Sequence, residues 1–398
     1  MNATINHADL LRLRMRAQGL AGSGAGSSAA SATKSGSSRL SGPEKIAATA
    51  SRMLAMQGQD WRSSRWALGV RTPGTTVADV YAAFNEALVV RSWPMRGTIH
   101  VVAAEDIGWM QSLTNHRVLA GAPKRRAFLG ITDSLLDRLT ETSLAALANG
   151  RSLDRDELSA VWTEASIEWQ SAWRYHMIWW LCQNGLTVFG PQLGDSEPRL
   201  VLAEGWIRNP RSLSGEEALA ELTTRYAAAR GPIRRKDLAW WSGLTLRETD
   251  RGLALATEAG RLVPVSLADD ADTLWVEPEL LESVGQASTT AGWHLLPAFD
   301  EHLLGYTNRD AQLSPEHFER IVPGKNGMFL ATVVNSGRVV GTWKRGAGKK
   351  GPVNLTPFPG ERVKPDAVRP EFERWAGFYG FDDIPLSLAD PHSKHPVG

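Results

Sequence analysis

The chain has 398 residues, 42% of them hydrophobic, which is more than one ordinary core requires and predicts two or three domains. Its single cysteine, Cys182, excludes an internal disulfide, and with no secretory leader in the sequence we expect a cytoplasmic protein. No apolar run is long enough to span a membrane, and a formal net charge of +1 excludes a general attraction to polyanions. Any binding of nucleic acid must therefore come from an uneven distribution of charge.

The first 41 residues divide into a short helix and a linker. Residues 6–18 place leucines beside arginines, which predicts a helix within an N-terminal segment of residues 1–18. Residues 19–41 are mostly glycine, alanine and serine, the composition of a flexible linker. We expect this tethered helix to dock on the body of the protein rather than on a partner.

Two glutamines follow the next predicted helix. Apolar residues recur at helical spacing over residues 46–54, and Gln57 is next on that apolar stripe. A buried amide needs partners for its donor and its acceptor, and Gly58 lets the chain leave the helix. Alternate residues of an extended segment point to the same side, so Gln57 and Gln59 can present two amides to one spot. The alternative is a helix end with two solvated glutamines, followed by Asp60, which either caps the next turn or assists electrostatically.

A pattern of two helices followed by two strand-like runs occurs three times. The predicted elements are 76–87, 89–93 and 97–102 in the first copy, 153–158, 175–183, 186–189 and 199–202 in the second, and 233–243, 246–258, 262–265 and 273–276 in the third. This is the layout of a winged helix, and three copies at comparable spacing support it better than one. We therefore predict an α+β fold with three tandem winged-helix modules, over residues 42–110, 111–210 and 211–292. Because winged helices also serve as protein-interaction modules, the layout alone leaves the function open.

The C-terminal region, residues 293–398, is predicted to be mostly β. Residues 329–334 and 338–343 are apolar strand-like runs on either side of a glycine-containing turn, which is a strong hairpin signal. Residues 321–360 contain no acidic residue, and the hairpin and the loop after it carry five cations: Arg338, Lys344, Arg345, Lys349 and Lys350. Such a basic hairpin can bind a nucleic-acid backbone, or its charges can be solvated and keep the strand edge from aggregating.

Three further polar residues are candidates for the site. His100 lies on a strand-like run and can face the same cavity as the glutamines, although a lone histidine is more often packed or at the surface. Arg91 and Arg96 flank a Trp-Pro-Met stretch, where they can contact phosphates or form structural ion pairs. The sequence leaves both the functional and the structural interpretation of these three residues open.

Other conspicuous residues are interpreted as structural. Asp300 and Glu301 have no spacing that identifies an acid and a base, so we interpret both as structural residues. The tryptophan pairs at 179–180 and 240–241 lie in apolar helices, so we interpret these tryptophans as core residues. There is no glycine-rich phosphate loop opening a helix after a strand, and no cluster of ligands with metal spacing. We therefore expect no nucleotide cofactor and no metal.

Four stretches together resemble a known family. They are residues 52–71 with Ala-Met-Gln-Gly-Gln-Asp, 91–100 with Arg-Ser-Trp-Pro-Met-Arg-Gly-Thr-Ile-His, 230–244 with Asp-Leu-Ala-Trp-Trp-Ser-Gly-Leu, and 295–306 with Leu-Leu-Pro-Ala-Phe-Asp-Glu. In this order they resemble the bacterial tandem winged-helix DNA glycosylases, the AlkZ-like proteins, from about residue 43 to residue 380.

The resemblance implies a reaction and a motif. Members excise alkylated bases, typically N7-alkylated purines, and some unhook interstrand crosslinks. The family motif is Gln, an aliphatic residue, then Gln or Asp, so the resemblance implies that Gln57 and Gln59 are catalytic, while Gly58 departs from the usual middle residue. It also implies a DNA-binding hairpin, which falls on residues 338–345. Since an N7-alkylated guanine is cationic and leaves readily, two neutral amides that orient a water suffice for such a reaction.

Two other functions compete with the glycosylase. A non-catalytic DNA-binding protein, such as a transcriptional regulator, would bind specific sequences as a dimer, but no dimerisation segment is visible and we expect a monomer. A protein-interaction scaffold would show no salt-dependent affinity for DNA. We therefore expect a nucleoid-associated enzyme whose partner is double-stranded DNA with alkylated bases or crosslinks.

Overall fold

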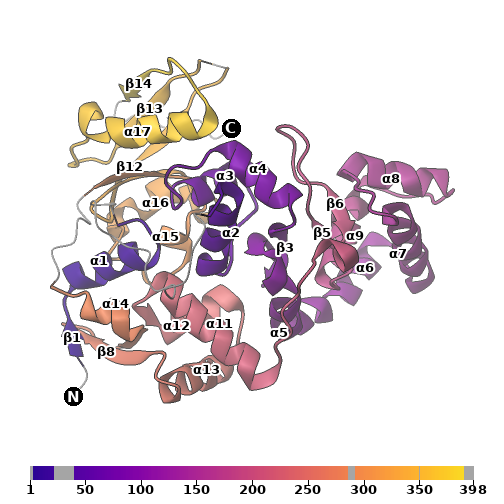
Figure 1. The fold of residues 1–398 in the computed structure, drawn as a ribbon, viewed down its shortest axis with the longest axis horizontal. Coiled ribbons are helices and arrows are strands. Elements are labelled where there is room, and N and C mark those ends of the chain that lie inside the picture. The colour runs from indigo at the N-terminus through magenta and orange to yellow at the C-terminus, as the bar shows by residue number, and fades with distance from the viewer. Residues whose placement is uncertain (1–2, 22–39, 286–291, 349, 390–398) are drawn as a thin grey trace.

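Three successive parts of the chain repeat one order of elements: a helix, a short strand, two helices and two further strands (Figure 1). The computed structural model describes residues 3–21, 40–285, 292–348 and 350–389. The first unit consists of α2 (Gly42–Met53), β2 (Met56–Gln57), α3 (Trp61–Gly69), α4 (Val77–Asn85), β3 (Val89–Met95) and β4 (Thr98–Ala103). The third consists of α11 (Gly215–Arg230), β7 (Ile233–Arg234), α12 (Arg235–Ser242), α13 (Leu246–Glu258), β8 (Val263–Leu267) and β9 (Thr273–Val276).

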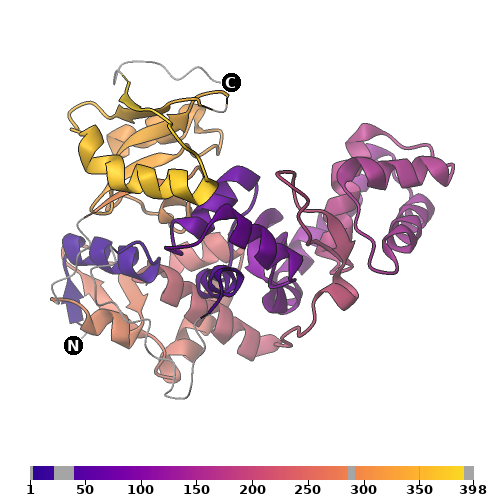
Figure 2. The ribbon, with the colours of Figure 1, turned by 45° about the horizontal axis from the view of Figure 1, so that its top comes forward.

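The second unit has the same order with a reduced first strand. It consists of α7 (Asp133–Leu147), α8 (Arg155–Glu164), α9 (Ser171–Gln183), β5 (Thr187–Phe189) and β6 (Leu200–Leu202), and a single bridge between Leu153 and Leu200 stands in for the first strand. Helices α5 (Ile107–Ala120) and α6 (Ala122–Leu129) join the first unit to the second, and the short α10 (Ala203–Trp206) and α14 (Pro278–Glu282) follow the second and third. The second unit has its own core around Trp162 and projects from the rest of the molecule (Figures 1 and 2).

The sheets connect the units. The first two share one five-stranded sheet of order β2-β4-β3-β5-β6, in which Arg91 of β3 pairs with Phe189 of β5. The third unit has a four-stranded sheet of order β1-β8-β9-β7. Its strand β1 (Ala3–Ile5) comes from the N-terminus and lies parallel to β8, which the sequence did not predict because three residues are too few to show a strand pattern.

The N-terminal helix docks on the body, as predicted. It forms α1 (His7–Ala17), and Arg14 on it is completely buried, with Nε donating to the carbonyl of Pro232 and Nη1 to the side chain of Gln312, both at 3.1 Å. Just after the helix, the Gln18 amide donates to the hydroxyl of Tyr306 at 2.9 Å. The predicted linker at residues 19–41 falls mainly on residues 22–39, outside the described residues.

The C-terminal region contains the predicted sheet and a helix that was not predicted. Strands β10 (Trp293–Leu296), β11 (Thr332–Asn335), β12 (Arg338–Arg345), β13 (Val353–Pro357) and β14 (Leu386–Leu388) form a five-stranded sheet in this order. The short helices α15 (Glu301–Leu304) and α16 (Phe318–Ile321) precede β11, and the 15-residue α17 (Pro365–Tyr379) packs against β10. Apolar residues at helical spacing bury one side of α17, so "mostly β" is an incomplete description of this region.

The first unit lies between the third unit and the C-terminal sheet. Trp66 of α3 is buried against that sheet, where its Nε1 donates to the carbonyl of Leu295 at 2.6 Å. On the other side, Arg230 at the end of α11 donates to the carbonyls of Met53 and Ala55, at 3.0 and 2.8 Å. The segment after α2, which contains both glutamines, therefore lies where three parts of the chain meet. No helix within the described ranges is both long and apolar enough to cross a bilayer.

Candidate active site

The two glutamines lie on extended backbone, not on a helix. Helix α2 ends at Met53, and Leu54 reverses the chain with a φ of 62°. The next residues form β2, in which Gln57 pairs with His100 of β4. The sequence placed Gln57 on the continuing apolar stripe of the helix, and this is wrong because the helix ends at Met53 and sheet pairing begins at Met56.

The two amides meet, as the extended geometry predicts. Gln57 Nε2 donates to Gln59 Oε1 at 3.2 Å. Gln57 is half-buried and Gln59 is exposed, so the pair lies at the surface with further donor and acceptor capacity directed to solvent. Two neutral amides in this arrangement can hold a water by donating to it and accepting from it.

The glycine between them is required by the packing. Gly58 N–H donates to the carbonyl of Ile99 at 2.8 Å, which draws the loop onto β4. A Cβ at position 58 would lie 2.9 Å from the carbonyl carbon of His100 and 3.0 Å from its Cα. Because the obstruction is backbone, a side chain cannot be accommodated by a rotamer change, and Gly58 is what allows this close approach.

A buried carboxylate holds the backbone of the first glutamine. The Gln57 N–H donates to Glu301 Oε1 at 3.1 Å. The other oxygen of Glu301 accepts from Arg230 Nη2 at 2.6 Å and from Trp241 Nε1 at 3.1 Å. Burial alone would raise the pKa of Glu301, but the charge of Arg230 and the hydrogen bonds from Arg230 and Trp241 lower the pKa below its ordinary value. Glu301 is therefore an ionised anchor, in keeping with its structural interpretation.

Arg91 holds the backbone of the second half of the motif. Its Nε donates to the carbonyl of Gly58 at 2.6 Å and its Nη2 to the carbonyl of Gln59 at 3.4 Å, while Nη1 pairs with Glu197 at 3.0 Å. The side chain is only 2% exposed. Of the two readings from the sequence, phosphate contact and structural ion pair, the second is correct, since this guanidinium is occupied inside the protein.

His100 does not face an open cavity. It is completely buried, and its Nδ1 donates to the carbonyl of Thr98 at 2.9 Å. Burial lowers the pKa of His100 to about 4, and the nearby Arg96 adds to this effect. The histidine is therefore neutral beneath the motif, and the expectation that it supports the reaction from the same cavity is wrong, because β4 directs it into the interior.

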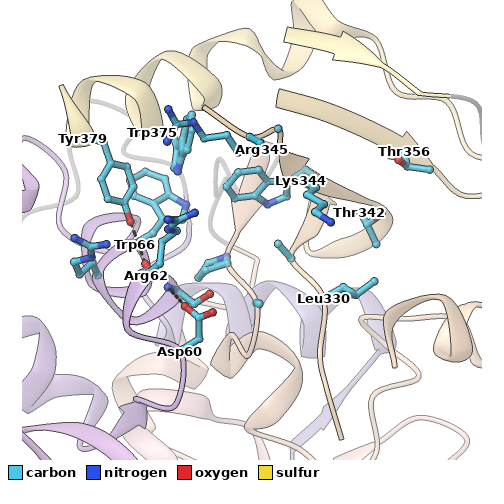
Figure 3. A pocket seen from close by; sticks show the side chains of 18 of the residues that line it. Asp60, Arg62, Trp66, Leu330, Thr342, Lys344, Arg345, Thr356, Trp375 and Tyr379 are labelled. Atoms are coloured by element: carbon cyan, nitrogen blue, oxygen red, sulfur yellow. Dashed lines mark hydrogen bonds between the residues drawn. The ribbon is translucent and has the colours of Figure 1, made fainter. Parts of the chain in front are cut away.

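Asp60 caps the next helix. Its Oδ1 accepts from the Ser63 N–H at 2.7 Å at the start of α3, which is the first of the two alternatives that the sequence left open. Asp60 also lines a large cleft between α3, α17 and the C-terminal sheet (Figure 3). The motif is thus joined to the cleft through the residue that follows it.

The cleft has a volume of about 1660 Å³ and combines aromatic walls with cations. Figure 3 shows Asp60 and Arg62 on the helical side and Lys344 and Arg345 on the sheet side. Its aromatic residues are Trp66, Trp343, Phe358, Trp375, Tyr379 and Phe381; its basic residues are Arg62, Arg65, Arg320, Lys344, Arg345 and Lys350; its acidic residues are Asp60, Asp195, Glu319 and Asp382. The structure thus brings the motif segment and three of the predicted DNA-binding cations to one cleft, which Gln57 and Gln59 adjoin without lining it.

Arg338 lies at the opposite end of β12 from the cations that line the cleft. The β11–β12 turn at Ser336 and Gly337 packs against α1, since a Cβ on Gly337 would lie 2.7 Å from the side chain of Leu11. Arg338 and Lys344 are six residues apart on β12, or roughly 20 Å at 3.3 Å per residue. The predicted basic residues that reach the cleft are therefore those at the end of β12 and in the β12–β13 loop, and Arg338 is not among them. Lys349 lies outside the described residues.

Arg96 is at the tip of the β3–β4 turn and stacks on an exposed tryptophan. Arg96 has a φ of 52° and its guanidinium lies 4.8 Å from the ring centre of Trp240. Trp240 is 38% exposed, so interpreting both members of this tryptophan pair as core is wrong; only Trp241 is fully buried. Burial lowers the pKa of Arg96.

Sequence reasoning missed part of the cleft. Arg62 and Arg65 are three residues apart on α3, a spacing that puts both on one face, and they line the cleft together with Arg320. The spacing of the two α3 arginines was a usable signal. The residues that α17 contributes to the cleft could not be found in this way, because that helix was not predicted. Within the described residues, no group of three or more His, Cys, Asp or Glu side chains could hold a metal ion.

Comparison with known proteins identifies the chain. A family model described as "DNA glycosylase AlkZ-like" matches residues 50–378. An interstrand DNA cross-link repair glycosylase of Streptomyces sahachiroi is 25% identical over 359 residues, which covers 85% of this chain and 91% of that protein. The solved structure of the Streptomyces sahachiroi DNA glycosylase AlkZ has a TM-score of 0.75 to this fold at 22% identity, over 97% of this chain and 100% of that chain.

These comparisons define the class of protein: a DNA glycosylase, which is a hydrolase that acts on N-glycosyl bonds. More narrowly, the chain belongs to the AlkZ-like family of DNA glycosylases, so the family resemblance seen in the sequence is confirmed. Its substrate is DNA.

Proposed function

We propose that the protein hydrolyses the N-glycosidic bond of N7-alkylated purines in double-stranded DNA, with Gln57 and Gln59 positioning the attacking water. The observation that carries this proposal is the hydrogen bond between the two amides, at 3.2 Å, on a backbone segment held by Glu301 and Arg91. A fixed pair of donors and acceptors at the surface is what water positioning requires.

An N7-alkylated purine is a substrate whose hydrolysis needs no strong base at the motif. Alkylation at N7 gives the purine a positive charge, so the base leaves with little help from a general acid. The remaining tasks are to orient a water on the sugar and to stabilise the oxocarbenium-like centre. The amides perform the first by proximity and orientation, and Asp60, the next residue, contributes negative charge near the second.

We interpret the three repeated units as winged helices and the cleft as a site for the DNA backbone. Lys344, Arg345 and Lys350 line the cleft on the sheet side, opposite Arg62 of α3. In this reading these cations neutralise phosphates and place the lesion against the motif.

We extend the proposal to interstrand crosslinks. The Streptomyces sahachiroi relative is described as a cross-link repair glycosylase. Gln59 is exposed, so the amides can reach a bulky or crosslinked base that is not fully extruded into a pocket. Excision and unhooking would then use one motif.

The test is release of free base from duplex DNA that carries N7-alkylguanine. The full chain is incubated with this DNA, and the products are separated by chromatography. We expect free alkylguanine and an abasic strand. Tight DNA binding without release would instead favour the non-catalytic DNA-binding function.

A further inference from the structure

Helix α6 forms a basic surface that the proposed reaction does not use. Residues 107–132 contain no Asp or Glu but carry Arg117, Lys124, Arg125 and Arg126. The chain as a whole has a net charge of only +1, so this segment is a local excess of positive charge. None of these four cations lines the cleft.

Two of the four cations have no carboxylate partner among the described residues. Arg126 pairs with Asp133 at 3.1 Å, and Arg117 is bound by a glutamate of α13. Lys124 and Arg125 are exposed and form no ion pair with any described residue. Their charges are therefore available to a polyanion at no cost in broken salt bridges.

Exposed aromatic rings accompany these charges. Phe128 on α6 is 78% exposed, and the guanidinium of Arg125 lies 5.1 Å from its ring centre. Tyr175 on α9 is 60% exposed. The two helices are joined where Trp173 Nε1 donates to the carbonyl of Leu129 at 2.8 Å. Exposed cations beside exposed aromatic rings are typical of surfaces that bind nucleic acid.

This surface lies close to the glutamine motif. A Cβ on Gly97, in the β3–β4 turn, would lie 3.2 Å from Val118 on α5, the helix that leads into α6. From that turn, β4 reaches His100, the partner of Gln57, in three residues, or roughly 10 Å. Lys124 follows Val118 by six residues, across the junction of α5 and α6 at Gly121.

We propose that α6, through Lys124, Arg125 and Phe128, binds the sugar–phosphate backbone of duplex DNA outside the cleft. The contact is independent of sequence, and it lengthens the duplex that the enzyme engages beyond the cleft. This inference rests on the proposed function, since it assigns a further part of the DNA substrate to a further part of the chain.

The experiment measures binding of the full chain to undamaged duplex DNA of about 20 base pairs while salt is varied between about 50 and 200 mM. For the double variant Lys124→Ala/Arg125→Ala we expect the slope of log affinity against log salt to fall in magnitude by about 1.8, which is about 0.9 for each phosphate contact. For Phe128→Ala we expect a several-fold lower affinity with the slope unchanged. The charge-matched control is Arg362→Ala/Lys364→Ala, which removes two exposed cations outside the cleft and α6, and its slope should equal that of the wild type.

The results separate this inference from the proposed function. If the wild type releases alkylguanine but the Lys124→Ala/Arg125→Ala slope stays at the wild-type value, the α6 contact is wrong and the proposed function stands; the basic surface then fits an acidic protein better than DNA. A slope that falls equally in the control also overturns the contact, because general charge would explain it. If the wild type neither binds duplex DNA nor releases base, both proposals fail.

Discussion

Glu301 fixes the backbone of Gln57, although the two residues are 244 positions apart in the chain. The Gln57 N–H donates to Glu301 Oε1 at 3.1 Å, and Arg230 holds the other oxygen at 2.6 Å. An amide of the motif in the first unit is thereby aligned by a carboxylate of the C-terminal region and a guanidinium of the third unit. The geometry of the motif depends on how these parts assemble, and not only on the local sequence around it.

Replacing Glu301 should lower excision more than DNA binding. Glu301→Gln keeps an acceptor for the Gln57 N–H but weakens the bond to Arg230, so the motif should shift slightly. Because a misplacement of about 1 Å can slow a reaction about 100-fold, we expect single-turnover excision to be about 10- to 100-fold slower. The affinity for undamaged duplex should stay within about twofold. Glu301→Ala leaves Arg230 buried without its partner and should destabilise the fold by about 3–5 kcal/mol. Wild-type excision by the Gln variant would show that this carboxylate does not position the motif.

A methyl group at position 58 should disturb the motif. In Gly58→Ala the new Cβ meets the backbone of β4 at 2.9 Å, and relieving this overlap should cost about 1–3 kcal/mol and separate the two amides. Gly108→Ala is the matched control, since nothing lies within 4 Å of a Cβ there and alanine favours its helix by about 0.5–1 kcal/mol. Thermal unfolding and base release of both variants test this. Equal stability of the Gly58→Ala variant and the wild type would contradict the clash.

The sequence predicted the repeated elements well because each carries its own local signal. The helices around residues 76–87, 175–183 and 246–258 show apolar periodicity, and all three are present as α4, α9 and α13. The meeting of Gln57 with Gln59 followed from the two-residue period of extended backbone.

What the sequence did not predict depends on contacts between distant segments. The burial of Arg91 and His100 is decided by Glu197 and by the pairing of β2 with β4, neither of which leaves a local pattern. Strand β1 exists only because β8 offers it an edge. The position of Arg338 depends on which end of its hairpin packs on α1, and chain order does not determine that.

Two cations on one strand should differ in their effect on DNA binding. Lys344 lines the cleft, whereas Arg338 is at the other end of β12 beside α1, and both are exposed. Lys344→Ala should therefore reduce the salt-dependence slope of duplex binding by about 0.9, and Arg338→Ala should leave it unchanged. If the two variants had equal slopes, the cleft would not be the site at which β12 meets DNA.

Stability should fall as the solution is acidified. Burial lowers the pKa of His100 to about 4, of His294 to about 3 and of His302 to about 4, so the folded state keeps these rings neutral while the unfolded state binds protons near pH 6.5. The stability that they contribute is complete above about pH 6.5 and is lost as pH falls towards 4, at no more than about 1.4 kcal/mol per pH unit for each group. Glu277 and Glu371, whose pKa values burial raises, oppose this in part. A thermal midpoint that stays constant from pH 7 to pH 5 would contradict the prediction.

The most direct test of the central claim is base release by Gln57→Ala and Gln59→Ala, measured under single-turnover conditions on duplex DNA with N7-alkylguanine. Water positioning by the amide pair predicts that either substitution slows release by about 100-fold or more while affinity for the duplex is retained. Release at the wild-type rate by either variant would contradict the role of the pair.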